Sequence, residues 1–298
     1  MARKRVLLVD GNNILHQSFH KFEKLKSTDG KPSGAIFGFF KSLHMYLDRF
    51  QPDDVYITFD NGHSPLRDKL LPNYKGHRKN ISYDRESLFA QKAVIMKILR
   101  MLRIKYLYDK NNSSGYEGDD LLAYLYFKVI SPEYLVTIVS SDKDFNQLLT
   151  TDRVKIFNPR KDDYIRKSNC KELFGYEPKE TVDYLSMVGD SSDDIPGVPG
   201  IGPVKARKLL DKYGSISNYI KIEPNISDKV LDILNRNHQL IDLKWFVGNN
   251  KLNLVNILKT YTRGNINYDK FREICIEYSF NSFMTDIFIE PFKKLLKK

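Results

Sequence analysis

Short apolar runs alternate along this chain with longer stretches of helical periodicity. Residues 5–10 are apolar from Val6 to Val9, as expected for a strand that is buried on both faces of a sheet. Helical periodicity follows over 35–50, and a second buried strand is predicted over 55–60. A strand, a helix and a second strand in this order form a βαβ unit, which favours a parallel sheet.

The same alternation continues through the middle of the chain. Further strands are predicted over 104–108, 134–139 and 154–157, with the last paired to 164–165, and helices over 88–102, 119–130 and 144–150. After about Pro178 the pattern changes, because helices over 180–188 and 203–213 flank a segment rich in Gly and Pro. Beyond Lys221 only short helices are expected. The pattern therefore predicts an α/β fold followed by a helical module.

Residues 61–86 interrupt this alternation. The segment is polar, basic and rich in turn-forming residues. An excursion of this length inside a compact domain is usually functional or disordered. We interpret it as a basic flap or arch over a crevice, and a solvated surface loop is the alternative.

Acidic residues recur where the predicted strands and helices stop or start. They are Asp10 and Asp60 after buried strands, Asp142 and Asp144 in a D-x-D pattern, Glu117, Asp119 and Asp120 before a helix, and Asp190, Asp193 and Asp194 in the Gly/Pro-rich segment. The carboxyl ends of parallel strands converge on one crevice, where ligands bind. Acids gathered there repel one another unless cations lie between them, and Mg²⁺ prefers carboxylate ligands. Helix capping is the simpler alternative for each acid taken alone.

The composition indicates a polyanionic binding partner. The chain of 298 residues has a formal net charge of +11 and a pI of about 9.3, which favours nucleic acid. Cys170 and Cys275 lie far apart without CxxC spacing, so we expect unpaired thiols and no zinc site. The sequence shows neither a signal-peptide core nor an apolar run that could span a bilayer, so the expectation is a cytoplasmic protein without a membrane partner.

A glycine-rich segment precedes a basic helix in the second part of the chain. Gly197-Val-Pro-Gly-Ile-Gly202 does not follow a strand, which argues against a dinucleotide-binding fingerprint. With Lys205, Arg207 and Lys208 after it, the segment fits a hairpin whose N–H groups meet phosphate oxygens. A structural turn with a solvated basic helix is the alternative. The histidines form no Ser/His/Asp or Cys/His arrangement and are interpreted as surface or packing residues.

Taken together, these blocks resemble the flap endonuclease family of 5′→3′ structure-specific nucleases. The resemblance is greatest to the bacterial type, the N-terminal nuclease of DNA polymerase I and its stand-alone bacterial and phage relatives. The matching blocks are Leu8-Val9-Asp10-Gly11, Phe59-Asp60, Tyr74-Lys75-Gly76-His77-Arg78, Gly115-Tyr116-Glu117-Gly118-Asp119-Asp120, Ser141-Asp142-Lys143-Asp144, Gly189-Asp190, Asp193-Asp194-Ile195-Pro196-Gly197 and Gly200-Ile201-Gly202. Each block is weak alone, but their order is specific up to about Leu210, and the match is loose beyond Lys221.

The resemblance implies a fold and a domain division. The fold is a three-layer α/β/α nuclease core with a mostly parallel sheet, a helical arch and a helix–hairpin–helix-type DNA-binding module. The expected divisions are a metal-dependent nuclease core at 1–177 with the arch at about 61–90, a duplex-binding module at 178–245, and a C-terminal segment at 246–298 that packs on the core.

The resemblance also assigns roles to residues. The implied metal ligands are Asp10, Asp60, Glu117, Asp119, Asp120, Asp142, Asp144, Asp190 and Asp193. Lys75 and Arg78 match the cations at the base of the arch that contact the scissile phosphate. DNA binding is assigned to Tyr74, Gly197, Gly200, Gly202, Lys205, Arg207 and Lys208. One departure is Asp194, which stands where the family commonly has Asn and adds charge near the second metal.

The implied function is Mg²⁺-dependent 5′→3′ exonuclease and 5′-flap endonuclease activity that removes primers or flaps in replication and repair. Two Mg²⁺ ions are expected, with Mn²⁺ as a substitute and K⁺ at the hairpin. The expected substrates are DNA with a 5′ flap or 5′ end and RNA–DNA hybrids. The protein is expected to be a monomer that works with replication proteins.

Two other classes of protein stay open. One is a DNA-binding protein with an inactive site, although every acidic block is intact. The other is a phosphatase or phosphotransferase with Asp10 as nucleophile. That chemistry needs D-x-D at this position, where the sequence reads Asp10-Gly11-Asn12.

Overall fold

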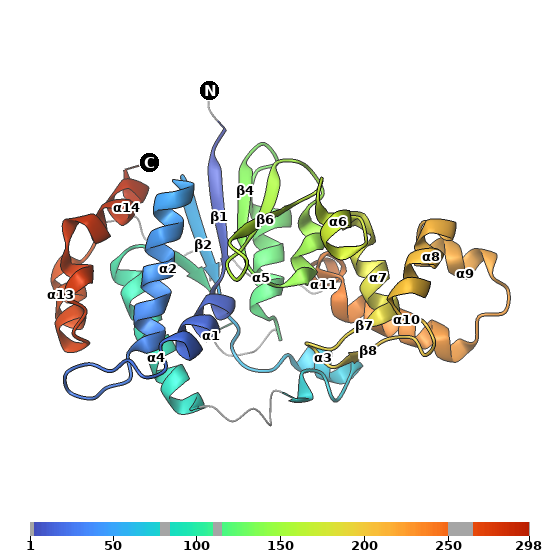
Figure 1. The fold of residues 1–298 in the computed structure, drawn as a ribbon, viewed down its shortest axis with the longest axis horizontal. Helices are drawn as coiled ribbons and strands as arrows, with labels where there is room; N and C mark the ends of the chain where they lie inside the picture. Colours follow the sequence, from blue (N-terminus) through green and yellow to red (C-terminus); the bar gives the residue numbers. More distant parts are fainter. Residues whose placement is uncertain (1–2, 78–83, 110–114, 250–264, 298) are drawn as a thin grey trace.

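A six-stranded sheet forms the centre of the computed structural model, which describes residues 3–77, 84–109, 115–249 and 265–297 (Figure 1). The strand order is β3-β2-β1-β4-β5-β6. The strands are β1 (Arg5–Asp10), β2 (Asp54–Thr58), β3 (Lys105–Leu107), β4 (Leu135–Val139), β5 (Val154–Asn158) and β6 (Asp163–Arg166). All neighbouring pairs are parallel except β5–β6, which is antiparallel. The predicted mostly parallel α/β sheet is thus confirmed.

The central strand β1 shows why the sheet is covered on both faces. Leu7 and Val9 join the hydrophobic core on one side of the sheet, whereas Val6 and Leu8 join the core on the other. Successive side chains of a strand point to opposite faces, so a continuous apolar run needs a helical layer on each face. The result is the predicted three-layer α/β/α architecture.

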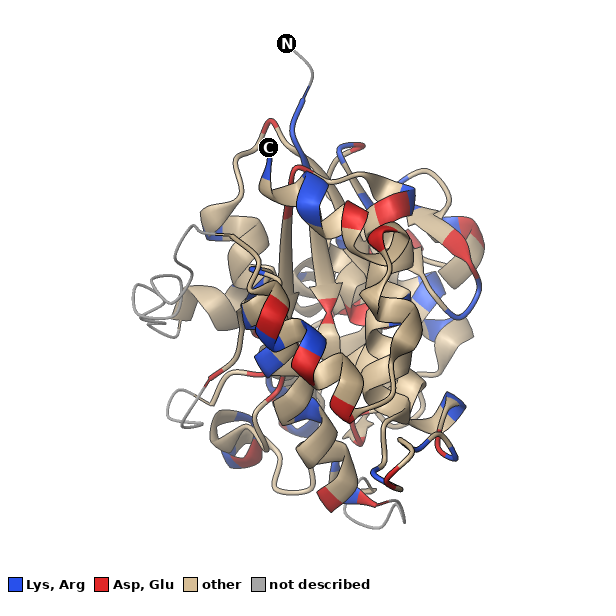
Figure 2. Ribbon diagram, turned by 90° about the vertical axis from the view of Figure 1, so that its left-hand side faces the viewer, with Lys and Arg blue, Asp and Glu red and all other residues tan. Residues whose placement is uncertain are grey.

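The two outer layers are built from helices that are far apart in the sequence. One layer holds α1 (Gly11–Lys21), α2 (Gly34–Phe50), α4 (Arg85–Met101), α13 (Tyr268–Glu277) and α14 (Asp286–Leu296) (Figure 1). The other holds α5 (Gly118–Tyr124), the π-helical turn Leu125–Val129 and α11 (Leu243–Asn249). The Phe37 and Phe283 rings stack at 5.4 Å between centroids, which ties the C-terminal helices to α2. The side that carries α13 and α14 shows both signs of charge interspersed (Figure 2).

A smaller helical part with its own core lies at one end of the sheet (Figure 1). It contains α7 (Thr181–Val188), α8 (Pro203–Tyr213), α9 (Ile216–Ile222) and α10 (Asp228–Ile241). Between α7 and α8, the two-residue strands β7 (Gly189–Asp190) and β8 (Ile195–Pro196) pair antiparallel. A Cβ at Gly197 would lie 2.3 Å from the Val188 carbonyl oxygen, so only glycine fits where the segment folds back on α7.

Several elements differ from the sequence-based expectation. Helix α1 was not predicted, although Ile14, Leu15, Ser18 and Phe19 are buried at helical spacing. The basic excursion contains a short helix, α3 (Pro65–Leu70). The remaining elements are η3 (Lys143–Leu148), a 3₁₀ helix at the place of the predicted short helix, α6 (Cys170–Phe174), η4 (Pro178–Glu180) and η5 (Asn281–Met284). No helix in the described ranges combines the length and apolar character needed to cross a bilayer.

Candidate active site

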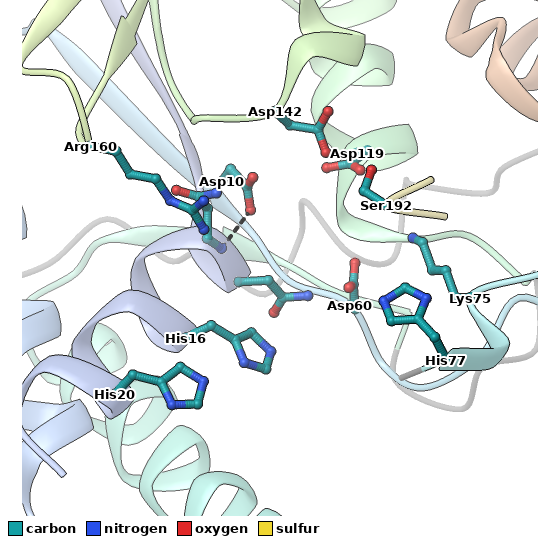
Figure 3. Close-up of a pocket in the computed structure, with 12 residues that line it drawn as sticks. Asp10, His16, His20, Asp60, Lys75, His77, Asp119, Asp142, Arg160 and Ser192 are labelled. Atoms are coloured by element: carbon teal, nitrogen blue, oxygen red, sulfur yellow. Dashed lines mark hydrogen bonds between the residues drawn. The ribbon is translucent and has the colours of Figure 1, made fainter. Parts of the chain in front are cut away.

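A cavity of about 350 Å³ opens at the carboxyl ends of the central strands (Figure 3). The predicted metal ligands that line it are Asp10, Asp60, Asp119 and Asp142, which come from the ends of β1, β2 and β4 and from the start of α5. The other lining residues are Asn12, Asn13, His16, His20, Lys75, His77, Arg160 and Ser192. The convergence of acids predicted from the parallel sheet is therefore present.

Hydrogen bonds fix the ends of β1 and β4 next to each other. The Asp10 side chain caps α1 by accepting from the Asn13 N–H at 3.0 Å. It also accepts from the Ser140 hydroxyl at 2.7 Å, and that hydroxyl accepts from the Asp142 N–H at 3.0 Å. Asp10 is thus both a helix cap and part of the cavity wall, so the two interpretations of this residue coexist.

Helix α5 is placed by a close contact with the end of β2. The Gly118 N–H donates to Asp60 Oδ1 at 2.6 Å, and a Cβ at Gly118 would lie 3.0 Å from that oxygen. Glycine at 118 therefore allows the first turn of α5 to approach Asp60, and this approach puts Asp119 into the cavity. On the other side, the Lys92 ammonium of α4 donates to the Asp60 carbonyl.

The cavity carboxylates perturb one another electrostatically. Burial, and then the charges of Asp60 and Asp142, raise the pKa of Asp10 to about 7. Burial and the charges of Asp10, Asp142 and Asp60 raise the pKa of Asp119 well above its usual range. Burial, and then Asp193 and Asp190, raise the pKa of Asp142. Ionising each acid is unfavourable beside the other carboxylates, and a bound cation would offset their mutual repulsion.

The side chain of Asp144 has the properties of a group that would bind a cation. Its Oδ1 atom is buried and has no hydrogen-bond partner, and burial followed by Asp142 and Asp190 raises its pKa well above the usual range. An ionised carboxylate only accepts, so this oxygen suits a hard cation. No three acidic, His or Cys side chains in the described ranges are gathered closely enough to hold an ion alone. The donors offered by the cavity acids and Asp144 are carboxylate oxygens, the type of ligand that hard cations such as Mg²⁺ prefer.

We expect Asp144→Asn to raise the melting temperature of the protein in a chelating buffer at neutral pH. An acid whose folded pKa lies above its unfolded value of 3.8 loses stability as pH rises between the two values, so the charge is costly at pH 7. The melting temperature should rise by about 2–4 °C for each kcal/mol relieved. Calorimetry in EDTA and then in excess Mg²⁺ checks this. A lower melting temperature for the variant in EDTA would contradict the assignment of Asp144 as a cation-seeking group.

Lys75 is held in the cavity wall by a buried ion pair. The residue is 6% exposed, and its ammonium donates to both carboxylate oxygens of Glu117 at 2.9 Å. Burial alone would lower the pKa of Lys75, but Glu117 holds it well above its usual range. Burial alone would likewise raise the pKa of Glu117, but Lys75 and Arg67 hold it at about 2. Both partners are charged, and Glu117 faces Lys75 rather than lining the cavity.

Asp120 and Tyr74 have contacts that favour structural roles over the predicted ones. Asp120 accepts from the Arg67 guanidinium at 2.7 and 2.8 Å and from the Glu117 N–H at 2.9 Å, and it does not line the cavity. These contacts disfavour metal ligation by Asp120. Tyr74 is 3% exposed, and its hydroxyl donates to Glu117 at 2.8 Å and to Asp193 at 3.1 Å. Its buried ring is not presented to DNA.

The segment between β7 and β8 is bound to the segment around Lys75. Asp190 accepts from the Lys143 ammonium at 3.0 Å and the Ser192 hydroxyl at 2.6 Å. The Asp193 carbonyl accepts from the Lys75 N–H at 2.9 Å. Asp194, with φ of 55°, accepts from the His77 N–H at 2.8 Å. Asn and Asp both tolerate a positive φ, which explains how the Asp194 departure is accommodated.

The predicted DNA-binding cations after the hairpin divide into two kinds. Lys205 and Lys208 are exposed. Arg207 instead donates to Glu180 at 2.8 and 3.1 Å and to the Gly175 carbonyl at 3.0 Å, so it joins α8 to the chain before α7. Gly200 and Gly202 have open space around them.

We expect Lys208→Ala and Arg207→Ala to act differently. Lys208→Ala should weaken duplex binding on all sequences and reduce the salt slope of binding by about 1, because an exposed lysine reaches phosphates. Arg207→Ala should instead lower the melting temperature, because it leaves Glu180 unpaired. Binding measured over a range of salt concentrations, together with thermal unfolding, checks both. A sequence-dependent loss with Lys208→Ala would indicate base readout.

Three histidines also line the cavity, namely His16, His20 and His77. His20 and His77 are exposed, which agrees with their interpretation as surface residues. Asn12, His16 and His20 repeat every four residues on α1, and this spacing was a usable signal.

Arg160 extends from the β5–β6 turn toward Asp10 (Figure 3). Arg78 lies outside the described residues.

Comparison with known proteins points to one family. A model described as the 5′-3′ exonuclease N-terminal resolvase-like domain matches residues 5–175, and one described as the 5′-3′ exonuclease C-terminal SAM fold matches 176–257. The chain is 34% identical over 218 residues to a 5′-3′ exonuclease of Aquifex aeolicus, covering 73% of each chain. It is 36% identical over 232 residues to the thermostable DNA polymerase I of Thermus aquaticus, covering 76% of this chain and 27% of the polymerase.

Solved structures share the fold at lower sequence identity. The bacteriophage T5 D15 flap endonuclease (D155K), solved as a pseudo-enzyme-product complex with DNA and metal ions, aligns with a TM-score of 0.68 and 20% identity. That alignment covers 99% of this chain and 100% of the T5 chain. The flap endonuclease-1 of Methanococcus jannaschii aligns with a TM-score of 0.60 and 16% identity over 99% and 92% of the two chains. The likeness confirms the nuclease-type fold.

Proposed function

This chain belongs to the 5′-3′ exonuclease family, and we propose that it acts on DNA as a Mg²⁺-dependent 5′→3′ exonuclease and 5′-flap endonuclease. One observation carries the proposal. Asp10, Asp60, Asp119 and Asp142 line one cavity together with the charged Lys75. That cavity offers oxygen ligands to cations on one side and a fixed positive charge on the other.

Divalent metals are assigned to the acids that lack strong cationic partners. Asp10, Asp119, Asp142 and Asp144 would hold them, with Asp60, Asp190 and Asp193 around them. Two Mg²⁺ ions, replaceable by Mn²⁺, would activate a water and stabilise the leaving oxygen when bound. Glu117, whose carboxylate is neutralised by Lys75, would position that lysine. T5 relatives were solved with metal ions, including zinc, which supports divalent-metal binding in this fold.

The cationic side of the cavity is assigned to the DNA phosphates. Lys75, fixed by Glu117, would stabilise the negative charge that develops on the scissile phosphate. Arg78 is proposed to act beside it. Arg160, His16 and His20 face the same cavity and would offer donors to neighbouring phosphates of the same strand (Figure 3).

The helical part beyond the sheet is assigned to the duplex. We keep the division into a nuclease core at 1–177, a duplex-binding module at 178–245 and a C-terminal segment at 246–298. Lys205, Lys208 and the open backbone at Gly200 and Gly202 would contact phosphates, with K⁺ bound by the hairpin carbonyls. The T5 neighbour was solved with DNA, which supports DNA binding by this fold.

The biological role follows from the substrates. A nuclease of this kind would act as a monomer and remove RNA primers and 5′ flaps in replication and repair. RNA–DNA hybrids would be substrates, and replication proteins would be partners.

The test is cleavage of a 5′-labelled flap DNA with the full chain, in Mg²⁺, in Mn²⁺ and in EDTA. We expect cleavage at the flap junction with either metal and none in EDTA, and stepwise release of nucleotides from the 5′ end of duplex DNA. Binding without cleavage under all conditions would show an inactive DNA-binding protein. Hydrolysis of a phosphomonoester without flap cleavage would show a phosphatase.

A further inference from the structure

A second cavity lies at the opposite end of the central strands and is lined by residues at the starts of β1, β4 and β5. Its volume is about 420 Å³, within the range of about 300–1,000 Å³ typical of small-molecule sites. Its cationic lining residues are Arg5, Arg49, Arg153 and Lys155. The acid in its lining is Asp152. Positive charge therefore dominates a cavity that the proposed nuclease function does not use.

Two of the cations in this region face each other directly. Lys155 of β5 and Arg166 of β6 are register partners in the antiparallel pair. Like charges directly opposite each other destabilise a sheet. The Lys155 ammonium lies 4.5 Å and the Arg166 guanidinium 4.6 Å from the Tyr164 ring centroid. Burial, and then Arg166 and Arg49, lower the pKa of Lys155. Both cations thus share the face of one aromatic ring, which attracts each of them through its negative face.

The other cations come from separate elements and are incompletely neutralised. Arg49, at the end of α2, pairs with Asp162 at 2.5 Å. Arg153 donates to the Tyr134 carbonyl at 3.3 Å and lies over the Tyr126 ring. Within the described ranges, the side chains of Arg5 and Lys155 form no ion pair.

Protection of the sheet edge explains only part of this arrangement. Strand β6 is an edge strand, and cations on an edge prevent pairing with another chain. That reason covers Arg166 but not Lys155, which lies on the inner strand β5. It does not explain why Arg5 and Arg153, from the start of β1 and the turn before β5, line the same cavity.

We propose that this cavity binds a small phosphate-bearing anion. Arginine guanidinium groups bind phosphate oxygens through paired hydrogen bonds, and Lys155 would add a point charge. The rings of Phe50 and Tyr164, which also line the cavity, offer apolar surface to the rest of such a ligand. Arg5 and Asp10 lie at opposite ends of β1, roughly 17 Å apart at 3.3 Å per residue. The site is therefore separate from the cavity that carries the acids.

Isothermal titration of the full chain with inorganic pyrophosphate in EDTA tests the proposal. Lys155→Gln and Arg153→Gln should each weaken binding about tenfold, the loss expected for one charge-assisted contact. Lys97→Gln, at an exposed position on α4, makes the same charge change as Lys155→Gln and should leave binding unchanged. Arg160→Gln shows whether pyrophosphate binds in the acid-lined cavity instead, because Arg160 lines that cavity. Lys155→Gln should fold at least as stably as the wild type, since it relieves the repulsion with Arg166.

Several outcomes would overturn the proposal. One is that Lys155→Gln binds pyrophosphate as tightly as the wild type, and another is that Lys97→Gln loses as much affinity as Lys155→Gln. The others are a loss of affinity in Arg160→Gln alone and no measurable binding by the wild type. A second titration with a nucleoside 5′-monophosphate shows whether the cavity recognises a nucleotide or the phosphate group alone. Tighter binding than pyrophosphate, lost in Tyr164→Leu, would identify a nucleotide, and equal binding would identify the phosphate group alone. If only a single-stranded oligonucleotide responded to Lys155→Gln, the site would instead be a nucleic-acid contact.

Discussion

Asp142→Asn should abolish flap cleavage while leaving the binding of flap DNA nearly intact. The single-turnover rate should fall by roughly 10³ or more, beyond the 10²–10³ of a single electrostatic donor, because both the metals and the nucleophilic water depend on the carboxylates. Asp142 touches no predicted DNA-binding residue, and its N–H is fixed by Ser140, so the amide should keep the local fold. DNA affinity should come mainly from cations elsewhere on the protein.

The measurement compares single-turnover cleavage in Mg²⁺ with DNA affinity in Ca²⁺. Asp29→Asn is the matched control, because it removes one negative charge from an exposed position that does not line the cavity. The control should cleave at the wild-type rate. Wild-type cleavage by Asp142→Asn at saturating enzyme would contradict the assignment of this acid as a metal ligand. A parallel loss of DNA affinity would mean that the substitution damages the fold.

Much of the candidate site could be predicted from the sequence because parallel strands place their carboxyl ends together. Asp10 and Asp60 follow apolar runs that could only be buried strands, and the structure puts both beside Asp142 in one cavity. Of the D-x-D pattern after β4, Asp142 lines this cavity, whereas Asp144 is not among its lining residues. The hydrophobic pattern shows where each strand ends. Because the strands are parallel, the acids that follow them all lie at the same end of the sheet.

Which acids are already neutralised could not be predicted. Glu117 is paired with Lys75 across 42 positions of sequence, and Asp120 with Arg67 across 53. The same holds for Arg207, which the pattern assigned to DNA but Glu180 engages. Such pairs depend on tertiary contacts that no local pattern encodes. Arg160 was missed for the same reason, since a turn residue carries no periodicity that reveals where it points.

Lys75→Ala should lower the single-turnover cleavage rate by roughly 10²–10³, comparable to the loss of one preorganised electrostatic donor. The ammonium is buried at the cavity wall and held by both oxygens of Glu117. It is therefore already in position before the reaction, and no free energy is needed to place it there. A residue that merely steers DNA would act on association and be screened by salt. The dissociation constant measured in Ca²⁺ should therefore rise far less than the rate falls. Lys75→Arg should recover only part of the rate, because the two cationic groups differ in shape and hydration.

The ion pair requires a control, since Lys75→Ala also leaves Glu117 buried with fewer partners. Breaking one partner of a buried pair typically costs about 3–5 kcal/mol, so the variant should be assayed well below its melting temperature. Glu117→Gln removes the same ion pair but keeps the lysine charge at the cavity. If Lys75 stabilises charge on the phosphate, Glu117→Gln should retain more activity than Lys75→Ala at equal folded fraction. If both lose the same activity, the reaction depends on the intact ion pair and not on the lysine charge alone. Wild-type cleavage by Lys75→Ala at saturating enzyme would instead show that the basic segment after Asp60 only guides DNA to the acids.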